Sequence, residues 1–589
     1  MSENELGLFG KNDKPDHESA WKLYEKGQEF NQSIRLDDTV KVNENFYIGR
    51  QWEGVEANGL PTPQENFLKR VVGFTVATVT TDNITVNASA LAATDNTDEL
   101  IEPVRIVNEE FVALSERNRV PAMLRAFTRN AAVDGDGCTY TYWDASVKNR
   151  HGGKGDIRTE IIDNTRVQFG NPNDRRVQTQ PYIQIVSREI TRRVKLKAKE
   201  NGMKDWEAIV PDSESTEQTD SVKLTDDMTT VLLTLWKDEE TGEVWAYEST
   251  KDAGVREPWN LGIYLYPVTW LNWDYVKDCY HGQAMVTGLI PNQIVVNRLW
   301  AMSALHATKG AFPKYVYNKT LIAKWDNRVG SAIGIAGGDI NNVAKVIDGA
   351  PLNPQVSNMI TQLVKSTEES MGATGTAMGE GRADNTSAII ALQRAAATPT
   401  ELTKQNLYET VEDLFRIYLE FMSEYYGKRM VDMAPPEEMV QQAAALGITL
   451  PDTMPVEFDF STLKDHPMTI KLDVGASSYY SEIASIQTLD NLLRDGHIDV
   501  VQYLERIPDG YIPARRALVA EIKQKQAAMQ AQQAMMGGMP GMEEAGGIAP
   551  EMTGGSPMAG VGPMANNGGS GYGELQRAIN ATGDVKGIK

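Results

Sequence analysis

LIPNQIVVNRLWAMSALHATKGA, spanning Leu289 to Ala311, is the stretch around which the rest of the chain can be organised. Its apolar residues recur at the spacing of one face of a helix. Gly310 and Pro313 stop the pattern, because neither residue favours a helix interior. We therefore predict a helix here. The residues available for packing are Ile294, Leu299, Met302 and Leu305.

A short insert and a second helix follow this first helix. KYVYN (314–318) and SAIGIAG (331–337) have strand-like patterns, and the insert ends near Gly349. From Asn353 to Met371 the apolar residues again fall on one helical face. They are Val356, Met359, Ile360, Leu363 and Val364. The middle of the chain is thus predicted to be a helix, a small α/β insert and a second helix.

The part of the chain before these helices changes from helical to strand-like patterns. A polar helix is expected within residues 16–60, and helical periodicity follows from Gln64 to Val79 and from Asp98 to Arg129. Later segments alternate or are β-branched, as strands are. These segments are CTYTYW (138–143), DIRTEII (156–162) and YIQIVSREI (182–190). This order predicts an α+β domain.

A concentrated acidic segment lies between residues 205 and 257. It contains 15 Asp or Glu against four Lys or Arg, an excess of 11 that is half of the net charge of -22. We expect this segment to be an exposed insertion, because a solvated face is the usual setting of such charge. Within it, TTVLLTLW and EVWAYEST are predicted to form a hairpin across Gly242.

Beyond the second helix the chain becomes glycine-rich and then strongly helical. Residues 372–388 contain several glycines and predict a long loop. A helix from Thr386 to Tyr426 should follow, with a kink at Pro399 because proline removes a backbone donor. PVEFDF and MTIKLDV predict strands, and a helical region broken at Asp495 and Gly496 comes next.

Composition sets bounds on what the protein does. The excess of carboxylates repels phosphate, so tight wrapping of nucleic acid is disfavoured, whereas a channel through which DNA slides is compatible with it. Cys138 and Cys279 are too few for a disulfide framework and predict a reducing environment. The polar first residues lack the apolar core of a signal peptide, and no membrane segment is expected.

Catalytic and metal-binding motifs were sought. HGGKGD (151–156) departs from the phosphate-binding loop pattern, and DGDG (134–137) lacks the further oxygen ligands of a calcium loop. Both are interpreted as turns. The six histidines have no short ligand spacing and are interpreted as ordinary polar residues. We therefore predict a non-enzymatic protein without catalytic residues, metal or cofactor.

The order of elements and four local motifs resemble the portal proteins of tailed double-stranded DNA bacteriophages, which form the head–tail connector ring. The resemblance spans nearly the whole chain, although no motif in it is a catalytic fingerprint. The motifs are YIGRQW (47–52), AAVDGDGCTYTYWD (131–144), VQFGNPN to YIQIVSRE (167–189) and GEGRADNTSAIIALQRA (379–395).

The resemblance implies a division of the chain into portal regions. They are an N-terminal arm (1–60), the first part of the wing (61–288), stem helix 1 (289–312), the clip (313–350), stem helix 2 (351–375), the tunnel loop (376–387), the second part of the wing with its long kinked helix (388–478), a helical crown (479–535) and a disordered Met- and Gly-rich tail (536–589).

It also implies a function and partners. Portal proteins form rings, typically of 12 subunits, at one capsid vertex of the virion after assembly in the host cytoplasm. Double-stranded DNA passes through the ring during packaging and ejection. The terminase large subunit and a head–tail adaptor dock on it, and the major capsid and scaffold proteins surround it. The basic charge of residues 289–350, seven Lys or Arg against three Asp, fits such docking.

The resemblance assigns two sets of site residues. Those expected to face DNA in the tunnel loop are Met378, Gly379, Glu380, Gly381, Arg382, Asp384 and Asn385. Those expected to contact partners from the clip are Lys319, Lys324, Trp325 and Arg328.

Two alternatives from other classes remain open at this point. One is a metal-dependent nuclease or hydrolase that uses the carboxylates of the acidic segment. The other is a monomeric scaffold or adaptor protein of virion assembly that captures partners with its tail. Ring formation distinguishes a portal protein from both.

Overall fold

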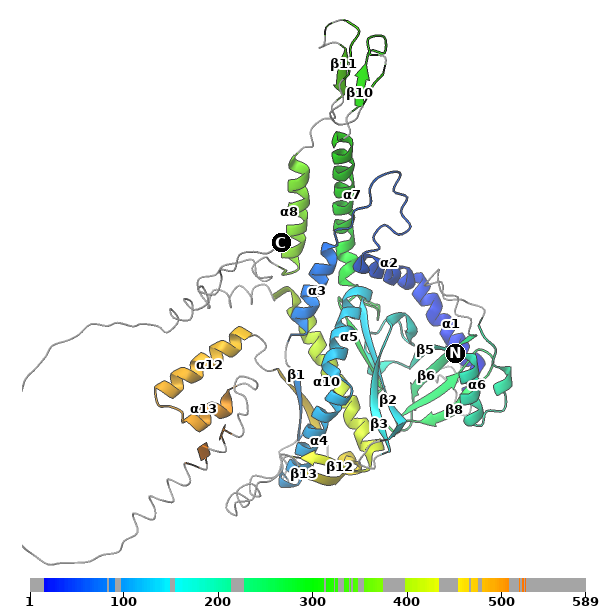
Figure 1. Cartoon of the computed structure of the whole chain (residues 1–589). Helices are drawn as coiled ribbons and strands as arrows, with labels where there is room; N and C mark the ends of the chain where they lie inside the picture. Colours follow the sequence, from blue (N-terminus) through cyan, green and yellow to red (C-terminus); the bar gives the residue numbers. More distant parts are fainter. Residues whose placement is uncertain are drawn as a thin grey trace, which may run out of the picture. The chain divides into compact units, whose positions relative to one another are not determined.

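The computed structural model contains both helices and antiparallel sheets, so the predicted α+β class is confirmed (Figure 1). Two compact units are present, Met1–His497 and Ile498–Lys589. The structure describes residues 15–81, 84–90, 97–148, 154–212, 227–311, 314–322, 324–326, 333–337, 339, 343–347, 354–373, 398–433, 454–465, 468–474, 479–507, 518–519, 522–523 and 525.

The N-terminal region contains three helices. The predicted polar helix is divided into α1 (His17–Ser33) and α2 (Leu36–Ile48), because Arg35 between them adopts the left-handed conformation with φ of 54°. Asp16 caps α1 by accepting a 2.8 Å hydrogen bond from the amide of Ser19. The third helix, α3 (Phe67–Val79), is confirmed.

The predicted helical stretch from Asp98 to Arg129 consists of two helices. They are α4 (Thr97–Arg117) and α5 (Val120–Asp134), separated where Arg119 is left-handed. Helix α5 ends at Gly135, whose φ of 105° permits the tight turn into β2 (Asp136–Lys148). The interpretation of DGDG as a turn between helix and strand is therefore confirmed.

A three-stranded antiparallel sheet has the order β3-β2-β9. Strand β2 pairs with β3 (Lys154–Ile162) on one side and with β9 (Val268–Asn272) on the other, so Cys138 is opposite both Ile162 and Trp270. Helices α5 and α10 (Glu401–Phe421) contact this sheet. Two further helical segments, the 3₁₀ turn Thr398–Thr400 and the π-helix Met422–Tyr426, flank α10.

The prediction that residues 205–257 form an exposed insertion is wrong for most of the segment. Its second half supplies three strands of a five-stranded antiparallel sheet in which Leu232, Leu235 and Ala246 are fully buried. The strands in order are β4 (Val167–Phe169), β5 (Tyr182–Ile190), β6 (Met228–Lys237), β7 (Val244–Ser249) and β8 (Gly254–Asn260). Helix α6 (Thr191–Glu200) follows β5. The predicted hairpin across Gly242 is confirmed as β6–β7.

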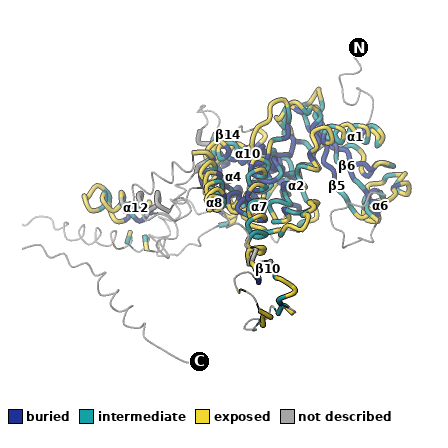
Figure 2. Tube along the Cα trace, turned by 90° about the horizontal axis from the view of Figure 1, so that it is seen from above, coloured by how far each residue is buried: buried dark blue, intermediate teal, exposed yellow. Residues whose placement is uncertain are grey.

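The main hydrophobic core lies between the helices and these sheets. Phe111 of α4 meets Phe415 of α10 edge to face, with ring centroids 5.0 Å apart. The hydroxyl of Tyr418, on the same face of α10, lies 2.8 Å from that of Thr159 on β3. Figure 2 shows buried residues along α10, β5 and β6, whereas α8 (Pro354–Ser370) is largely exposed.

The predicted central order of helix, insert and helix is confirmed, with two corrections. Helix α7 (Met285–Ala311) begins before Leu289, because Met285 and Val286 are buried against the core. The insert contains β10 (Lys314–Tyr317) paired with β11 (Ala344–Ile347). Residues 333–337 of the predicted SAIGIAG strand are not in a strand, so AKVI provides the partner instead.

The remaining strands join segments that are far apart in the sequence. Strand β1 (Ile84–Ala90) pairs with β14 (Met468–Val474), and β12 (Lys428–Met433) pairs with β13 (Met454–Asp459). Helix α12 (Tyr479–Arg494) ends the first unit, and α13 (Val500–Arg506) belongs to the second. The predicted break between these helices is confirmed.

Candidate functional site: the α7–α8 pair and its base

Helix α7 begins at a buried polar cluster centred on Asp136, a residue that is 1% exposed. The amide nitrogen of Asn272 and the backbone amide of Gly282 donate to Oδ1 at 2.8 Å and 2.7 Å. Nδ1 of His281 lies 2.7 Å from Oδ2. Because residues 281–284 lead directly into α7, these bonds fix the start of the helix.

Two glycines permit this close packing. A Cβ atom on Gly135 would stand 2.7 Å from the carbonyl oxygen of Gly282, and one on Gly282 would stand 2.9 Å from Cβ of Asn272. Both separations are too short for non-bonded heavy atoms, so larger residues would displace the chain that leads into α7. His281, interpreted from the sequence as an ordinary polar residue, is in fact a buried partner of Asp136.

A second polar layer joins α7 to the turn formed by YIGRQW. Nδ2 of Asn297 donates to Oε1 of Gln51 at 2.7 Å, and Nε2 of Gln293 donates to Oδ1 of Asn297 at 2.9 Å. Gln293 also donates to the carbonyl of Glu65 at 2.7 Å. All three amide side chains are buried, so water does not compete for their hydrogen bonds. These hydrogen bonds orient the lower half of α7.

Helix α2 contributes a further connection through Asn43. Its Nδ2 donates at 2.9 Å both to the carbonyl of Val133 in α5 and to Oγ1 of Thr287 in α7. One buried amide therefore holds three helices at a common point. The base of α7 is thus constrained from the N-terminal helices, from α5 and from β2.

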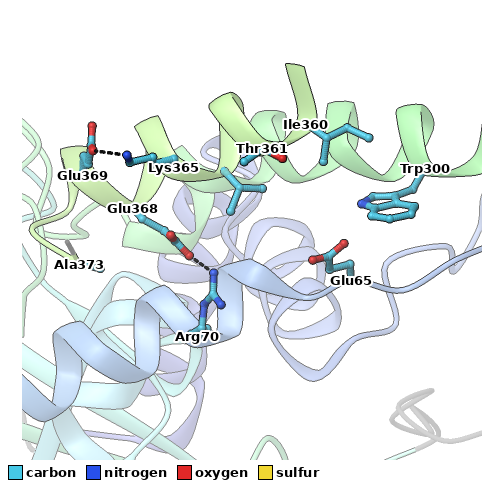
Figure 3. Close-up of a pocket in the computed structure, with 10 residues that line it drawn as sticks. Glu65, Arg70, Trp300, Ile360, Thr361, Lys365, Glu368, Glu369 and Ala373 are labelled. Carbon is cyan, nitrogen blue, oxygen red and sulfur yellow. Dashed lines mark hydrogen bonds and ion pairs between the residues drawn. The ribbon is translucent and has the colours of Figure 1, made fainter. Parts of the chain in front are cut away.

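Helix α8 is held beside the base of α7 by polar contacts (Figure 1). Nδ2 of Asn292 in α7 donates to Oγ1 of Thr367 in α8 at 3.0 Å. Arg70 of α3 forms an ion pair with Glu368 of α8 (Figure 3). The side chain of Glu368 is 12% exposed and that of Arg70 is 58% exposed, so water reaches this ion pair from the α3 side, as it does a surface pair.

A cleft of about 340 Å³ lies between α3, α7 and α8. Trp300 of α7 and Ile360 of α8 line it at the same end of the labelled group in Figure 3, and Arg70 points into it from α3. Trp300 comes after Asn292, whereas Ile360 comes before Thr367. The two helices therefore run antiparallel.

The far halves of both helices carry apolar side chains that the single chain does not cover. Met302 on α7 is 51% exposed and Met359 on α8 is 55% exposed. Between residues 302 and 310 of α7, none is buried. The base of the pair is therefore packed within one chain, while its far half presents apolar surface to solvent.

The predicted clip residues lie in or beside the β10–β11 hairpin region. Lys319 and Lys324 are exposed, as partner contacts require. Trp325 stacks on Tyr317 of β10 with ring centroids 5.0 Å apart, so it packs within this segment of its own chain. Arg328 lies outside the described residues.

The predicted DNA-facing set also lies outside the described residues. Met378, Gly379, Glu380, Gly381, Arg382, Asp384 and Asn385 all belong to it. The segments that flank this set are described: α8 is followed by Gly372, with φ of 74°, and the 3₁₀ turn that contains Pro399 precedes α10. The predicted helix between Thr386 and residue 397, and the tail 536–589, are likewise outside the described part.

Sequence reasoning did not identify Asp136, Gln293 or Asn297 as anchoring residues. A signal was present, because Asn and Gln interrupt the otherwise apolar start of α7 and buried amides need partners. The partners themselves could not be inferred, since Gln51 is remote in the sequence.

No protein-family model matches the chain, and no curated protein matches it. Within the described ranges, no group of three or more His, Cys, Asp or Glu is arranged to hold a metal ion. No helix among the described residues is long and apolar enough to cross a membrane.

Asn297→Ala should destabilise the protein by about 1–3 kcal/mol, because it leaves the buried amides of Gln51 and Gln293 without a shared partner. Urea unfolding followed by tryptophan fluorescence measures the effect. Gln32→Ala, which truncates an exposed amide on α1, should change the midpoint little. Equal midpoints for the two variants would contradict an anchoring role for Asn297.

Asp134→Asn should stabilise the protein at pH 8 and have little effect at pH 4. Burial, together with nearby Glu44, Asp163 and Asp136, raises the pKa of Asp134 to about 7, and Arg129 opposes this shift. Its ordinary value is 3.8, so the unfolded chain loses this proton first. The stability contributed by the protonated form is therefore complete below pH 3.8 and lost as the pH rises through 7.

Thermal unfolding of wild type and Asp134→Asn across this pH range tests the prediction. The difference in Tm should grow between pH 4 and pH 8. Asp465→Asn, at an exposed carboxylate, provides the control and should show no such growth. A constant difference for Asp134→Asn would show that its proton is not linked to folding.

Proposed function

We propose that this chain is the subunit of a portal ring that conducts double-stranded DNA into and out of a viral capsid. The observation that carries the proposal is the α7–α8 pair. It is fixed at its base by buried polar layers, is joined by the β10–β11 segment, and exposes apolar side chains in its far half. A free monomer would leave this surface in water.

A ring accounts for the exposed apolar surface. Side chains such as Met302 and Met359 can be covered by neighbouring copies, and closed cyclic symmetry covers them in every copy without open-ended growth. The ring is expected to contain 12 subunits, by resemblance to portal proteins. The polar anchoring of α7 would keep the geometry equal in all copies.

Charge supports a conduit over a tight DNA binder. The net charge of -22 repels phosphate, so DNA would slide with few lasting contacts. We propose that residues 376–387 face the DNA at the narrowest point. Glu380 and Asp384 outnumber Arg382 there, which would make phosphate contacts weak and transient.

The proposed partners follow from the resemblance to portal proteins. The terminase large subunit would dock on the clip during packaging, and a head–tail adaptor would dock afterwards. The major capsid and scaffold proteins would surround the ring in the virion. Lys319 and Lys324 are exposed and basic, as contacts with an acidic partner surface require.

Purified full-length protein should form closed rings with a central opening. Negative-stain electron microscopy shows the opening, and light scattering gives the mass, which should be near 12 times the 65.1 kDa of one chain. A single 65.1 kDa species at every concentration and salt tested would refute the proposed function.

Reversing the clip charges, with Lys319→Glu and Lys324→Glu together, should weaken binding of the terminase large subunit at least tenfold and leave rings intact. Surface plasmon resonance on assembled rings measures the affinity. Lys22→Glu with Lys26→Glu, two exposed lysines on α1, makes the same change of charge elsewhere and should preserve binding. Equal loss in both variants would assign the effect to net charge instead of the clip.

A further inference from the structure

The contacts between α7 and α8 show which residues of the two helices lie at the same height along the helix axes. This height is called the level of a residue. Asn292 is level with Thr367, since their side chains share a hydrogen bond. Trp300 and Ile360 line one cleft. Trp300 is eight residues after Asn292, and Ile360 is seven residues before Thr367, so the two helices are antiparallel and these residues lie at nearly the same level. At about 1.5 Å per residue, Met302 and Met359 then differ in level by only about 3 Å.

Met302 faces away from the partner helix within its own chain. Trp300 points into the cleft toward α8, and two residues further along a helix turns the side chain by about 200°. Met302 is therefore on the opposite side of α7, in agreement with its exposure. Val295, one heptad earlier, is on the same side and is 38% exposed.

Met359 is uncovered on α8. It precedes Ile360, which is buried toward α3 and α7, so its side chain is turned by about 100° from the cleft. Its 55% exposure shows that neither α3 nor α7 of the same chain covers it. The pair thus has one uncovered methionine on each helix at nearly the same level.

Rotation about an axis parallel to a helix pair keeps every residue at its own level. In a closed ring whose helix pairs run along the axis, the outward side of α7 in one copy meets α8 of the next. We propose that Met302 packs against Met359 of the neighbouring copy, so that a ring of methionine contacts joins the subunits. This inference rests on the proposed ring.

The charges on the two helices are compatible with this packing. Helix α7 carries Arg298 and Lys309 without any Asp or Glu, whereas α8 carries Glu368 and Glu369 against Lys365. Because Glu368 pairs with Arg70 and Glu369 pairs with Lys365 in the same chain, α8 presents no net charge that would repel α7 of an adjacent copy. Contacts of α7 with α7 would bring together two cationic helices, which is unfavourable.

Disulfide cross-linking tests the contact. In a Cys279→Ser background, with Cys138 buried, Met302→Cys and Met359→Cys are combined in the full-length chain and the assembled protein is oxidised with diamide. Non-reducing electrophoresis should show a ladder of covalent oligomers, because each copy then offers one thiol to each neighbour. Each single-cysteine variant should give at most dimers.

A register control uses the same helices. Val295→Cys with Met359→Cys places the thiols about 8 Å apart in level, beyond the Cβ separation of roughly 3.5–4.5 Å that a disulfide needs. Its ladder should be at least tenfold weaker than that of the Met302 and Met359 pair. Equal ladders, or only a faster monomer band from a bond within one chain, would overturn the proposed contact.

Electron microscopy of the same samples separates the two proposals. Rings without a ladder would overturn the methionine contact and leave the ring function standing. Absence of rings in the Cys279→Ser background and in wild type would overturn both.

A second pair of substitutions does not depend on oxidation. Met302→Lys and Met359→Glu should each reduce ring yield severalfold, and together they should restore it by forming an ion pair across the contact. Failure of the combination to recover any yield would count against the contact.

Discussion

The buried carboxylate of Asp136 is the constraint on which the arrangement of this protein depends. A carboxylate removed from water must be surrounded by donors, and here the donors come from β9 and from the loop that leads into α7. The same residue begins β2, the central strand of the three-stranded sheet. One charge therefore couples the core of the chain to the start of its longest described helix.

The polar layers and the apolar surface of α7 divide the helix by function. Its lower half has Gln293 and Asn297 buried in specific hydrogen bonds, which fix orientation but favour no additional partner. Its upper half has Met302 exposed, and methionine adapts to many surfaces because its side chain is unbranched and flexible. The chain thus determines the direction of the helix internally and leaves the covering of its far half to another surface.

The sequence predicted those elements whose signal is local and did not predict those that depend on distant partners. The periodicity of α7, α8 and α3 and the alternation of β2 and β5 were sufficient to locate them. Strand β1 was not predicted because its partner β14 lies almost four hundred residues away. The acidic segment was misinterpreted because its total charge was averaged over strands and turns, although it contains the apolar run VLLTLW (231–236), in which Leu232 and Leu235 are buried. The base of α7 could be suspected from its amides, but its partners could not be derived without the fold.

In the proposed portal ring, the placement of charge along the chain would let an acidic protein both release DNA and bind other proteins. Residues 289–350 carry a net charge of +4 within a chain of net charge -22. Salt screens surface charge beyond about 10 Å, so the basic residues of 289–350 attract only groups that come close to them. Phosphate groups elsewhere along the chain would meet an acidic surface. In that proposed ring, a partner with acidic side chains would be attracted to residues 313–350 without DNA being held along the rest of its path. This separation needs Lys319 and Lys324, which follow α7 in the sequence, to be exposed, and the polar anchoring at the base of α7 keeps that helix in a defined direction.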